Sequence, residues 1–412
     1  MISPHVTLLT QIFPPESNAG ANRAGAAARA LALVAGLRVV TILPSYPSPE
    51  HHLVNNTLDG HDEAMSYTIE RSAAFHPHRG SYLIRAAREI GMASRVAWRS
   101  ARPRPDVYVA TSPSIFIGIA AAVVSTVTRR PLVIDVRDLT WEYLADDSRG
   151  RSRLLQILAV LLKKAAQISL KRAALISVSN AGIKLAIEEL GIEPDRIIDV
   201  PNGVSAEILD RGGSLPPPVA SPDRFVVTYA GALGYYQGIG SLIDVAGRMP
   251  DVDFRVIGDG PDRASLAEAV QRGGLTNVTL PGYLSRDAVF DHYGDSHILF
   301  AQLRDLPALS NATVPSKPYE LMATGRPIVY AGTGITAALL ETSGSAIIAE
   351  PENPSSIETA IRRLIDDQEM RAALGRAGSE AAQQFPREAI MSDFAAKVVG
   401  LTADQAGWQR PG

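Results

Sequence analysis

The stretch Val314-Pro-Ser-Lys-Pro-Tyr-Glu-Leu-Met-Ala-Thr-Gly-Arg-Pro-Ile-Val329 predicts a short helix that lies between a loop and a buried strand. Ser316 is a candidate N-cap, and Pro318 suits the first turn, where its missing N–H costs no hydrogen bond. Gly325 suits the C-cap, because glycine readily adopts the left-handed conformation that often ends a helix. The apolar residues after Pro327 predict the strand, so the stretch indicates one helix-to-strand step of an α/β fold.

Two charged side chains lie within one turn of this helix. The free N–H groups and the dipole of a helix N-terminus favour an anion, and Lys317 adds a full positive charge there. Glu320 can accept hydrogen bonds from two neighbouring hydroxyl groups. A cation for phosphate and a carboxylate for a diol would together hold a nucleoside diphosphate. The same residues also fit a plain helix cap, a solvated lysine and a surface glutamate.

The string Pro-Ser-Lys-x-x-Glu-Leu-Met-Ala-x-Gly-x-Pro-Ile-Val, which starts at Pro315, resembles the donor-binding segment of the retaining GT-B glycosyltransferases of family 4. The likeness is greatest to the branch that builds bacterial surface polysaccharides. In that family the glutamate holds the ribose hydroxyls of the nucleotide sugar, and the resemblance gives this role to Glu320. Many members carry another glutamate eight positions earlier, where this chain has Ala312. The contact to the donor sugar therefore has no assigned residue.

The composition is that of a globular protein: of the 412 residues, 46% are hydrophobic and 20% are charged. This length suits two domains with a core each. The absence of cysteine excludes disulfides, thiolate metal sites and cysteine nucleophiles, and is compatible with a reducing cytosol. Residues 1–204 carry 23 Lys and Arg against 18 Asp and Glu, whereas the remainder carries 17 against 25. We therefore expect the two halves to face different partners, or one partner differently.

The chain opens with a buried strand from His5, a loop of small residues, and an alanine-rich helix to about Leu37. By resemblance the loop lies where family 4 enzymes place the glycine-rich loop that reaches the phosphate and the acceptor. Gly20, Asn22 and Arg23 are therefore candidate contacts. Small residues at this position also simply let a helix pack close to a sheet.

Residues 79–105 contain seven arginines and a single acid, Glu89. On a helix, one narrow stripe would collect Arg85, Arg88, Arg95, Arg99 and Arg102. Such an edge suits anionic lipid headgroups or a pyrophosphate-linked acceptor, whereas an ordinary solvated face usually mixes charges. Residues 148–187 also lack acids, and their basic residues flank the apolar run Leu154–Leu162, which is too short to span a bilayer. This run predicts either a helix that lies on a surface or a core helix with basic ends.

The strand Leu132-Val-Ile-Asp-Val136 runs into Arg137 and Asp138, which places charged residues at the carboxyl edge of a parallel sheet. Open α/β folds bind their ligands at that edge. Related glycosyltransferases often read Arg-Asp-Leu-Trp-Pro here, and Arg137-Asp138-Leu139 match this with the tryptophan shifted by one residue. The resemblance makes Asp138 the candidate acceptor-side polar residue or general base. An aspartate that caps the next helix is the alternative.

The second half restarts with a strand over 225–230 and the glycine-rich loop 231–238, whose backbone N–H groups can approach a phosphate. The loop resembles the family 4 loop that binds the donor diphosphate, with Gly234 and Gln237 as candidate contacts. Gln237 stands where relatives often have lysine, so we expect more of the phosphate charge to fall to Lys317. The resemblance adds further donor contacts after the next two strands: Gly260, and Tyr283 and Leu284 beside a uracil base.

Strand–helix alternation in both halves predicts an α/β fold of two doubly wound Rossmann-like domains, and the resemblance makes this fold GT-B, with a central cleft between the domains. We expect an acceptor-side domain over residues 1–205, a proline-rich linker over 206–222 and a donor-binding domain over 223–386. A helix over 387–405 is expected to cross back and pack on the first domain.

The resemblance implies a retaining glycosyltransferase that moves a sugar from a UDP-sugar, N-acetylated sugars included, to a saccharide or lipid-linked acceptor in bacterial surface or exopolysaccharide synthesis. Lys317 and Asp138 are then the candidate catalytic residues, and no cofactor, metal ion or nucleic acid is expected. Two alternatives use the same architecture: a UDP-sugar 2-epimerase, and a nucleotide-sugar-binding protein without catalysis. Met1–Phe13 has no signal-peptide pattern, so we expect a cytoplasmic protein with peripheral contact to the membrane through the arginine stripe.

Overall fold

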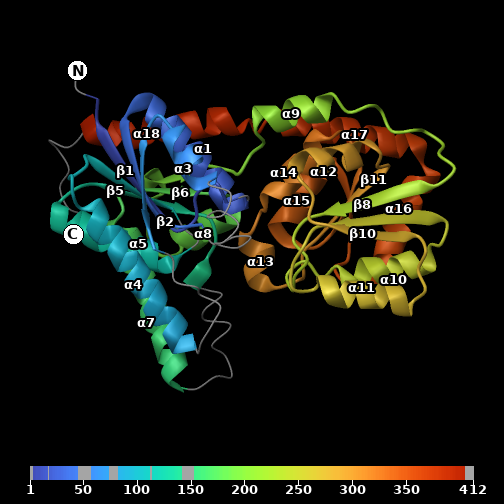
Figure 1. Ribbon diagram of the computed structural model, residues 1–412, viewed down its shortest axis with the longest axis horizontal. Coiled ribbons are helices and arrows are strands. Elements are labelled where there is room, and N and C mark those ends of the chain that lie inside the picture. The colour runs from blue at the N-terminus through green and yellow to red at the C-terminus, as the bar shows by residue number, and fades with distance from the viewer. Residues whose placement is uncertain are drawn as a thin grey trace. The chain divides into compact units, whose positions relative to one another are not determined.

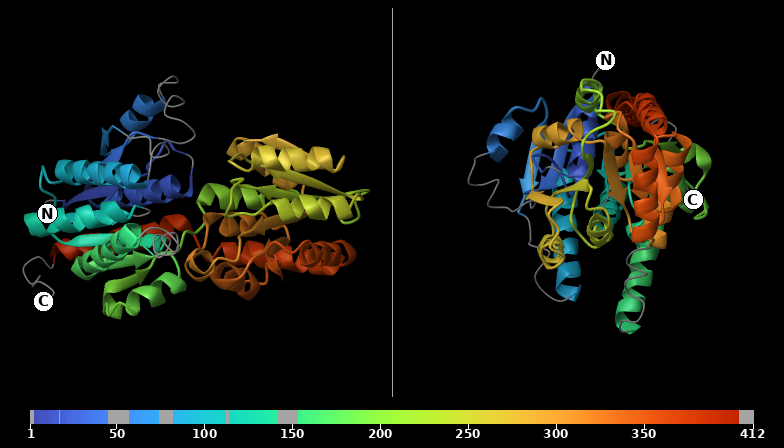
Figure 2. Two further views of the ribbon diagram at one scale, coloured as in Figure 1. Left: turned by 90° about the horizontal axis from the view of Figure 1, so that it is seen from below. Right: turned by 90° about the vertical axis from the view of Figure 1, so that its right-hand side faces the viewer.

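The computed structural model describes residues 3–16, 18–44, 57–73, 82–111, 114–141 and 153–403. The chain forms two compact units: unit 1 holds the residues up to Pro201 and the segment from Glu388, and unit 2 holds Asn202–Arg387. Each unit is built on one parallel sheet with helices on both faces (Figure 1, Figure 2). Both halves thus have the doubly wound α/β architecture that the strand–helix alternation predicts.

Unit 1 has a seven-stranded sheet in the order β3-β2-β1-β4-β5-β6-β7. Its strands are β1 (His5–Thr10), β2 (Gly36–Ile42), β3 (Thr68–Ser72), β4 (Val107–Thr111), β5 (Leu132–Val136), β6 (Leu175–Val178) and β7 (Ile197–Asp199). Every residue of β4 and β5 is buried, because parallel strands are covered on both faces. The strand order reverses between β1 and β4, and the carboxyl ends of strands beside such a point form the ligand-binding edge of α/β sheets.

The helices of unit 1 are α1 (Ala19–Val34), α3 (Thr57–Glu63), α4 (Tyr82–Ser100), α5 (Ile115–Thr128), α7 (Arg153–Arg172), α8 (Ala181–Glu188) and, from Glu388 onward, α18 (Arg387–Ala403). The last helix enters the core of this unit, since Met391 and Phe394 are buried in one cluster with Val6 and Leu31. The expected return of the C-terminal helix to the first domain is therefore confirmed.

Unit 2 has a six-stranded sheet in the order β10-β9-β8-β11-β12-β13. Its strands are β8 (Phe225–Ala230), β9 (Val252–Ile257), β10 (Val278–Gly282), β11 (Ile298–Gln302), β12 (Ile328–Ala331) and β13 (Ala346–Ala349). Its helices are α9 (Ala206–Gly213), α10 (Gly240–Arg248), α11 (Arg263–Arg272), α12 (Arg286–Gly294), α13 (Pro307–Ala312), α14 (Ser316–Ala323), α15 (Gly334–Thr342), α16 (Pro354–Asp366) and α17 (Gln368–Ala382). Here the strand order reverses between β8 and β11, which places the loops after these two strands side by side.

Residues 206–222, whose composition predicts a linker, begin with α9 and belong to unit 2. Ile208 is buried in one cluster with Tyr319 and Met322 of α14. The backbones of the two helices touch at Gly212, where an added Cβ would lie 2.0 Å from the carbonyl oxygen of Ala323. The apolar side of α9 therefore ties this segment to the unit, in spite of the glycines and prolines that follow it.

The ends of two helices differ in part from the sequence prediction. α14 begins at Ser316 itself, with Pro315 at the N-cap position and no side-chain cap hydrogen bond, whereas Gly325 has the expected positive φ of 65°. α4 ends at Ser100, so Arg102 lies past the helix and outside its stripe, because a residue before proline disfavours helical backbone. The side chain of Arg85 lies outside the described residues. None of the helices in the described part of the chain is long and apolar enough to cross a membrane.

The contact between α9 and α14 gives a test of the fold. We expect Gly212→Ala to lower the free energy of unfolding by about 1–3 kcal/mol, because its methyl group would overlap the backbone of α14. Gly213→Ala is the matched control, since a Cβ at the next residue of the same helix meets nothing within 4 Å. Urea unfolding of both variants measures the difference. Equal stability of the two variants would contradict the close packing of α9 on α14.

Candidate functional site

The carboxyl edge of the sheet in unit 2 is formed by backbone held very close to backbone. The loop after β8 and the turn after β9 touch at two glycines, Gly258 and Gly260, whose φ angles are 142° and 153°. A Cβ on Gly258 would lie 1.8 Å from the carbonyl oxygen of Gly231, and one on Gly260 would lie 2.2 Å from that of Leu233. Only glycine fits either position, so both residues set the shape of the predicted diphosphate loop.

Gln302, the last residue of β11, binds the same loop through hydrogen bonds. It is buried, and its amide donates to the carbonyl oxygens of Gln237 at 2.9 Å and Gly238 at 2.6 Å. Its Oε1 accepts from the Ser241 hydroxyl at 2.9 Å. The predicted contacts Gly234 and Gln237 thus lie on a loop that is fixed from β9 and β11, which leaves its solvent side for a ligand.

A cation that the sequence analysis did not single out lies against this loop. The guanidinium of Arg304 stacks over the ring of Tyr235 at 4.2 Å and pairs with Glu352 at 3.0 Å, and its backbone N–H donates to Tyr236 at 3.0 Å. A Cβ on Gly238 would meet Arg304 Nε at 3.2 Å, so arginine and glycine loop are in contact. Its position in the sequence could have identified it, because Arg304 stands two residues after β11, a strand that flanks the reversal of strand order.

Lys317 and Glu320 are brought together, as the helical spacing predicts. Lys317 Nζ lies 2.8 Å from Glu320 Oε1, and their side chains are 33% and 17% exposed. Tyr293, which is fully buried, donates its hydroxyl to Glu320 Oε1 at 3.3 Å and accepts from Lys317 Nζ at 3.4 Å. Burial and the Glu320 carboxylate raise the pKa of Tyr293 well above its usual value, so it stays a donor. Sequence analysis did not single out this tyrosine, because it comes from the distant helix α12.

The other predicted donor contacts have different surroundings. Tyr283 follows β10 and is exposed, as are Tyr235 and Tyr236 on the loop after β8. Leu284 packs against the buried cluster that contains Tyr293. Ala312 is buried on α13, where relatives often carry a glutamate. The structure therefore leaves the contact to the donor sugar without an assigned carboxylate.

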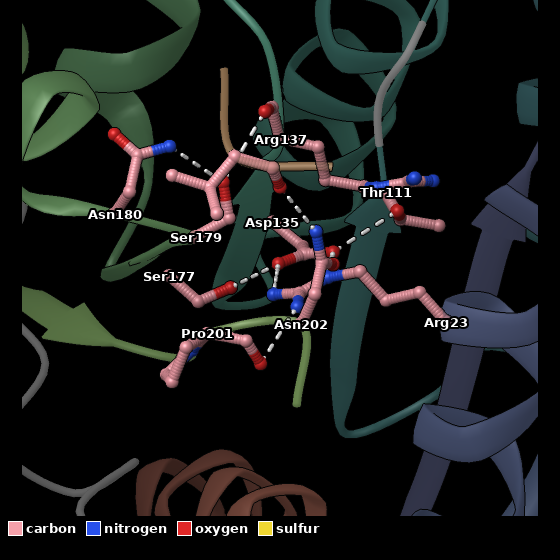
Figure 3. Close-up of polar contacts among 10 residues, drawn as sticks. Arg23, Thr111, Asp135, Arg137, Ser177, Ser179, Asn180, Pro201 and Asn202 are labelled. Atoms are coloured by element: carbon pink, nitrogen blue, oxygen red, sulfur yellow. Dashed lines mark hydrogen bonds and ion pairs between the residues drawn. The ribbon is translucent and has the colours of Figure 1, made fainter. Parts of the chain in front are cut away.

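The carboxyl edge of the sheet in unit 1 carries a buried ion pair (Figure 3). Arg23 binds Asp135 through two hydrogen bonds, Nη2 to Oδ1 at 2.7 Å and Nε to Oδ2 at 3.0 Å. The hydroxyls of Thr111 and Ser177 also donate to this carboxylate, at 3.1 Å and 2.7 Å. Burial alone would raise the pKa of Asp135, but the charge and hydrogen bonds of Arg23 outweigh it and hold the pKa below its usual value. Arg23 therefore holds Asp135; its predicted contact with a phosphate stays a prediction.

The N-terminus of α1 meets a further arginine, the half-buried Arg137, at the same edge. A Cβ on Gly20 would lie 3.2 Å from Arg137 Nη1, so glycine at this position lets Arg137 approach the helix. Burial and the nearby charge of Arg23 lower the pKa of Arg137. Asn22 is half-buried one turn into the helix, and Asp138 is half-buried beside Arg137. Gly20, Arg23 and Arg137 thus form one cluster, and the role of Asp138 as a base stays a prediction.

Neither edge offers a metal site in the described residues, where no three His, Asp or Glu side chains gather. One Asp-x-Asp triplet, Asp251-Val-Asp253, occurs in the sequence. It lies at the start of β9, at the amino edge of the sheet, where Asp253 pairs with Arg224 at 2.8 Å. The triplet is therefore on the opposite side of the sheet from Lys317 and Glu320.

Comparisons with known proteins agree with this architecture. A glycosyl transferase 4-like domain matches residues 18–203, and a domain of the glycosyl transferases group 1 matches residues 216–381. The chain is 24% identical over 355 residues to the Escherichia coli (strain K12) glycosyl transferase WcaI, named for colanic acid biosynthesis, covering 80% of this chain and 84% of WcaI. It is 25% identical over 186 residues to the lipopolysaccharide core biosynthesis glycosyltransferase LpsD of Rhizobium meliloti (strain 1021), covering 43% of this chain and 52% of LpsD.

Among solved structures, Anabaena Alr3699/HepE in complex with UDP superimposes with a TM-score of 0.66 at 16% identity, covering 96% of this chain and 99% of that chain. A structure of the same protein with UDP-glucose has a TM-score of 0.65. At this identity the likeness establishes the fold, which is that of the GT-B enzymes.

The buried ion pair gives a prediction about stability. We expect Asp135→Asn to lower the free energy of unfolding of unit 1 by about 3–5 kcal/mol, because it leaves the guanidinium of Arg23 buried without its counter-charge. Because the folded pKa of Asp135 is depressed, the stabilisation is present above the unfolded pKa of about 3.9 and is lost only as the pH falls through the lower folded pKa. Urea unfolding at neutral pH measures the loss.

Asp199→Asn is the matched control, since Asp199 forms an exposed ion pair with Lys184 at 2.9 Å. We expect little or no loss of stability in this variant, because solvent screens exposed pairs. Equal losses in the two variants would mean that Asp135 is not the buried counter-charge of Arg23.

Proposed function

We propose that this chain, which belongs to the GT-B glycosyltransferases, transfers a sugar from a UDP-sugar to a saccharide or lipid-linked acceptor in the synthesis of a bacterial surface or exopolysaccharide. The observation that carries the proposal is the ion pair of Lys317 and Glu320 in the first turn of α14. The chain leaves β11 at the carboxyl edge and returns through α14 to β12, so this turn lies at the same edge as the glycine-rich loop. The complexes of Alr3699/HepE support UDP as the nucleotide, and the names of WcaI and LpsD support a polysaccharide product.

In this proposal the donor separates the ion pair. The ribose hydroxyls replace Lys317 as partners of Glu320, and the diphosphate takes the ammonium group of Lys317. Both side chains are partly exposed, so the exchange needs no opening of the core. Tyr293 keeps Glu320 oriented throughout, because its hydroxyl reaches the carboxylate from a fully buried ring. The diphosphate and the ribose diol of the donor would thus meet a cation and a hydrogen-bond acceptor that already lie one helical turn apart.

The glycine-rich loop supplies the rest of the phosphate contacts. Its backbone N–H groups can approach the diphosphate closely, as in other glycine-rich anion loops. Gln237 carries no charge there, and we assign the missing cation to Arg304, whose guanidinium rests on Tyr235 of the same loop. The planar guanidinium matches the geometry of phosphate oxygens better than an ammonium does.

The chemical step breaks the bond between the anomeric carbon and the diphosphate oxygen while the acceptor hydroxyl bonds to that carbon. Negative charge grows on the leaving oxygen, so Lys317, Arg304 and the loop N–H groups stabilise the transition state more than the ground state. We assign retention of the anomeric configuration and independence of metal ions from the family resemblance of the Pro315–Val329 segment. Asp138 is the proposed acceptor-side base in unit 1.

The first test is thermal stabilisation by nucleotides. We expect UDP to raise the melting temperature, with GDP and ADP less effective, because ligand at about 100 times its Kd stabilises the folded state by about 2.7 kcal/mol. Glu320→Ala should abolish the shift, whereas Glu341→Ala, which changes an exposed glutamate on α15, should keep it.

With a sugar donor, Lys317→Ala and Glu320→Ala should both lose transfer while remaining folded. Full activity in these two variants would refute the assignment, and sugar isomerisation without acceptor would favour the epimerase.

A separate test concerns Arg304. We expect Arg304→Gln to raise the KM for the donor about 10- to 100-fold, because a hydrogen bond to a charged group contributes about 1.5–3 kcal/mol. Introducing lysine in the same chain by Gln237→Lys should restore part of the affinity. Arg224→Gln is the control, since Arg224 forms its ion pair at the opposite edge of the sheet. An unchanged KM in Arg304→Gln would show that Lys317 and the loop suffice.

A further inference from the structure

Helices α4, α5 and α7 of unit 1 enclose a groove whose lining is almost entirely apolar. Its volume is about 540 Å³, with α5 as its floor and α4 and α7 as its walls. Apart from Ser94, every lining side chain is hydrophobic, among them Ile90, Trp98, Val123, Val127 and Leu162. The groove contains no charge and no hydrogen-bond network, so it does not suit a sugar, a nucleotide or a metal ion.

The surface around the groove is apolar as well. Nine of the sixteen exposed large hydrophobic side chains in the described residues lie on these three helices, which is far more than an ordinary share of the surface: Ile84, Ile90, Trp98, Val123, Val127, Ile157, Val160, Leu161 and Ile168. Trp98 is 80% exposed and Val127 is 77% exposed. Exposed apolar side chains that gather on neighbouring helices in this way mark contact with another apolar body.

The outward face of α7 shows how this surface is built. Seven residues at helical spacing share it and all are exposed: Arg153, Ile157, Val160, Leu161, Lys164, Ile168 and Lys171. A helix that merely covers a sheet turns a polar face of mixed charge to water. Here the outward face alternates hydrophobic and cationic residues and carries no acid, which is the pattern of a helix that lies in a membrane interface.

Charge on the three helices is almost entirely positive. Together α4 and α7 carry nine Lys and Arg, and α5 carries no charge. The one acid is Glu89, whose carboxylate accepts a hydrogen bond from Ser114 at 3.2 Å. Arg99, part of the arginine stripe, donates to the carbonyl oxygen of Arg71 at 3.2 Å, so the stripe is partly structural. The basic residues of α7 supply much of the positive field. A second copy of this chain would bring like charges together, whereas an anionic surface would be attracted.

We propose that the α4–α5–α7 face binds the surface of an anionic lipid bilayer, with hydrocarbon entering the groove and with the cations of α4 and α7 at the level of the headgroups. Figure 1 shows the ends of α4 and α7 extending past the strands of the seven-stranded sheet, where they can reach a flat surface. The attachment is peripheral, since no helix crosses the bilayer in this arrangement. The proposal goes beyond glycosyl transfer and does not depend on the identity of the donor.

The test is co-sedimentation of the full chain with vesicles, without donor or acceptor. We expect binding to vesicles of phosphatidylglycerol and phosphatidylcholine in equal parts, weaker binding at high salt, and none to phosphatidylcholine alone.

The double variant Trp98→Ser, Val127→Ser should weaken binding at least about tenfold through lost apolar contact. Lys164→Gln and Lys171→Gln should each weaken it about fivefold. Trp98 emission should shift to the blue on binding, and Trp98→Phe should lose that shift while still binding.

Matched controls lie elsewhere in unit 1. Leu33→Ser on α1 removes a side chain that is 85% exposed, and Lys397→Gln removes an exposed cation on α18. Both variants should bind like the wild type. Failure of the wild type to bind mixed vesicles, or equal losses in the controls, overturns the proposal. So does dimerisation in sedimentation velocity that the Trp98→Ser, Val127→Ser variant abolishes, because it would make a second copy the occupant. Donor binding is measured separately, so either proposal can fail alone.

Discussion

Parallel strands that are covered on both faces leave the strand ends as the place for polar side chains, and the organisation of this protein follows from that constraint. β4 and β5 are buried throughout, and β11 is buried up to Gln302. In each unit the strand order reverses once, between β1 and β4 and between β8 and β11. The loops beside each reversal have no neighbouring crossover above them, so their backbone N–H groups and side chains are the ones that can meet a ligand.

The ion pairs at the two sheet edges differ in their exposure to water. In unit 1 the charges of Arg23 and Asp135 are desolvated and satisfied by each other and by two hydroxyls, which makes the pair a rigid support rather than a reactive group. In unit 2 Lys317 and Glu320 stay partly exposed. Each also forms one long hydrogen bond with the buried hydroxyl of Tyr293. A pair of the second kind can exchange partners at low cost, because desolvation has not committed it to a single geometry.

Local patterns were sufficient to predict the architecture. Hydrophobic strands alternating with amphipathic helices gave both doubly wound sheets, and the spacing of Lys317 and Glu320 gave their meeting on α14. Spatial neighbours from distant segments were not predictable in this way: Tyr293 reaches Glu320 from α12, and Arg23 reaches Asp135 across 112 residues. The linker prediction failed for α9, because glycine and proline content does not reveal that Ile208 is buried against α14. That burial makes the start of the segment part of unit 2. Arg102 left the predicted stripe because Pro103 ends α4.

The exposed apolar face of unit 1 has no explanation in the stability of the fold. Burying Ile157, Val160 and Leu161 would stabilise the unit, and polar residues in their place would keep the sheet covered equally well. Unit 2 shows that a sheet of this kind can be covered without such a face, since none of its described helices exposes a large hydrophobic side chain. The exposed apolar residues of α4, α5 and α7 coincide with helices that carry nine cations and one acid. Apolar surface alone would favour aggregation, but like charges oppose self-association. The combination therefore favours an apolar partner of opposite charge, and an anionic bilayer meets both conditions.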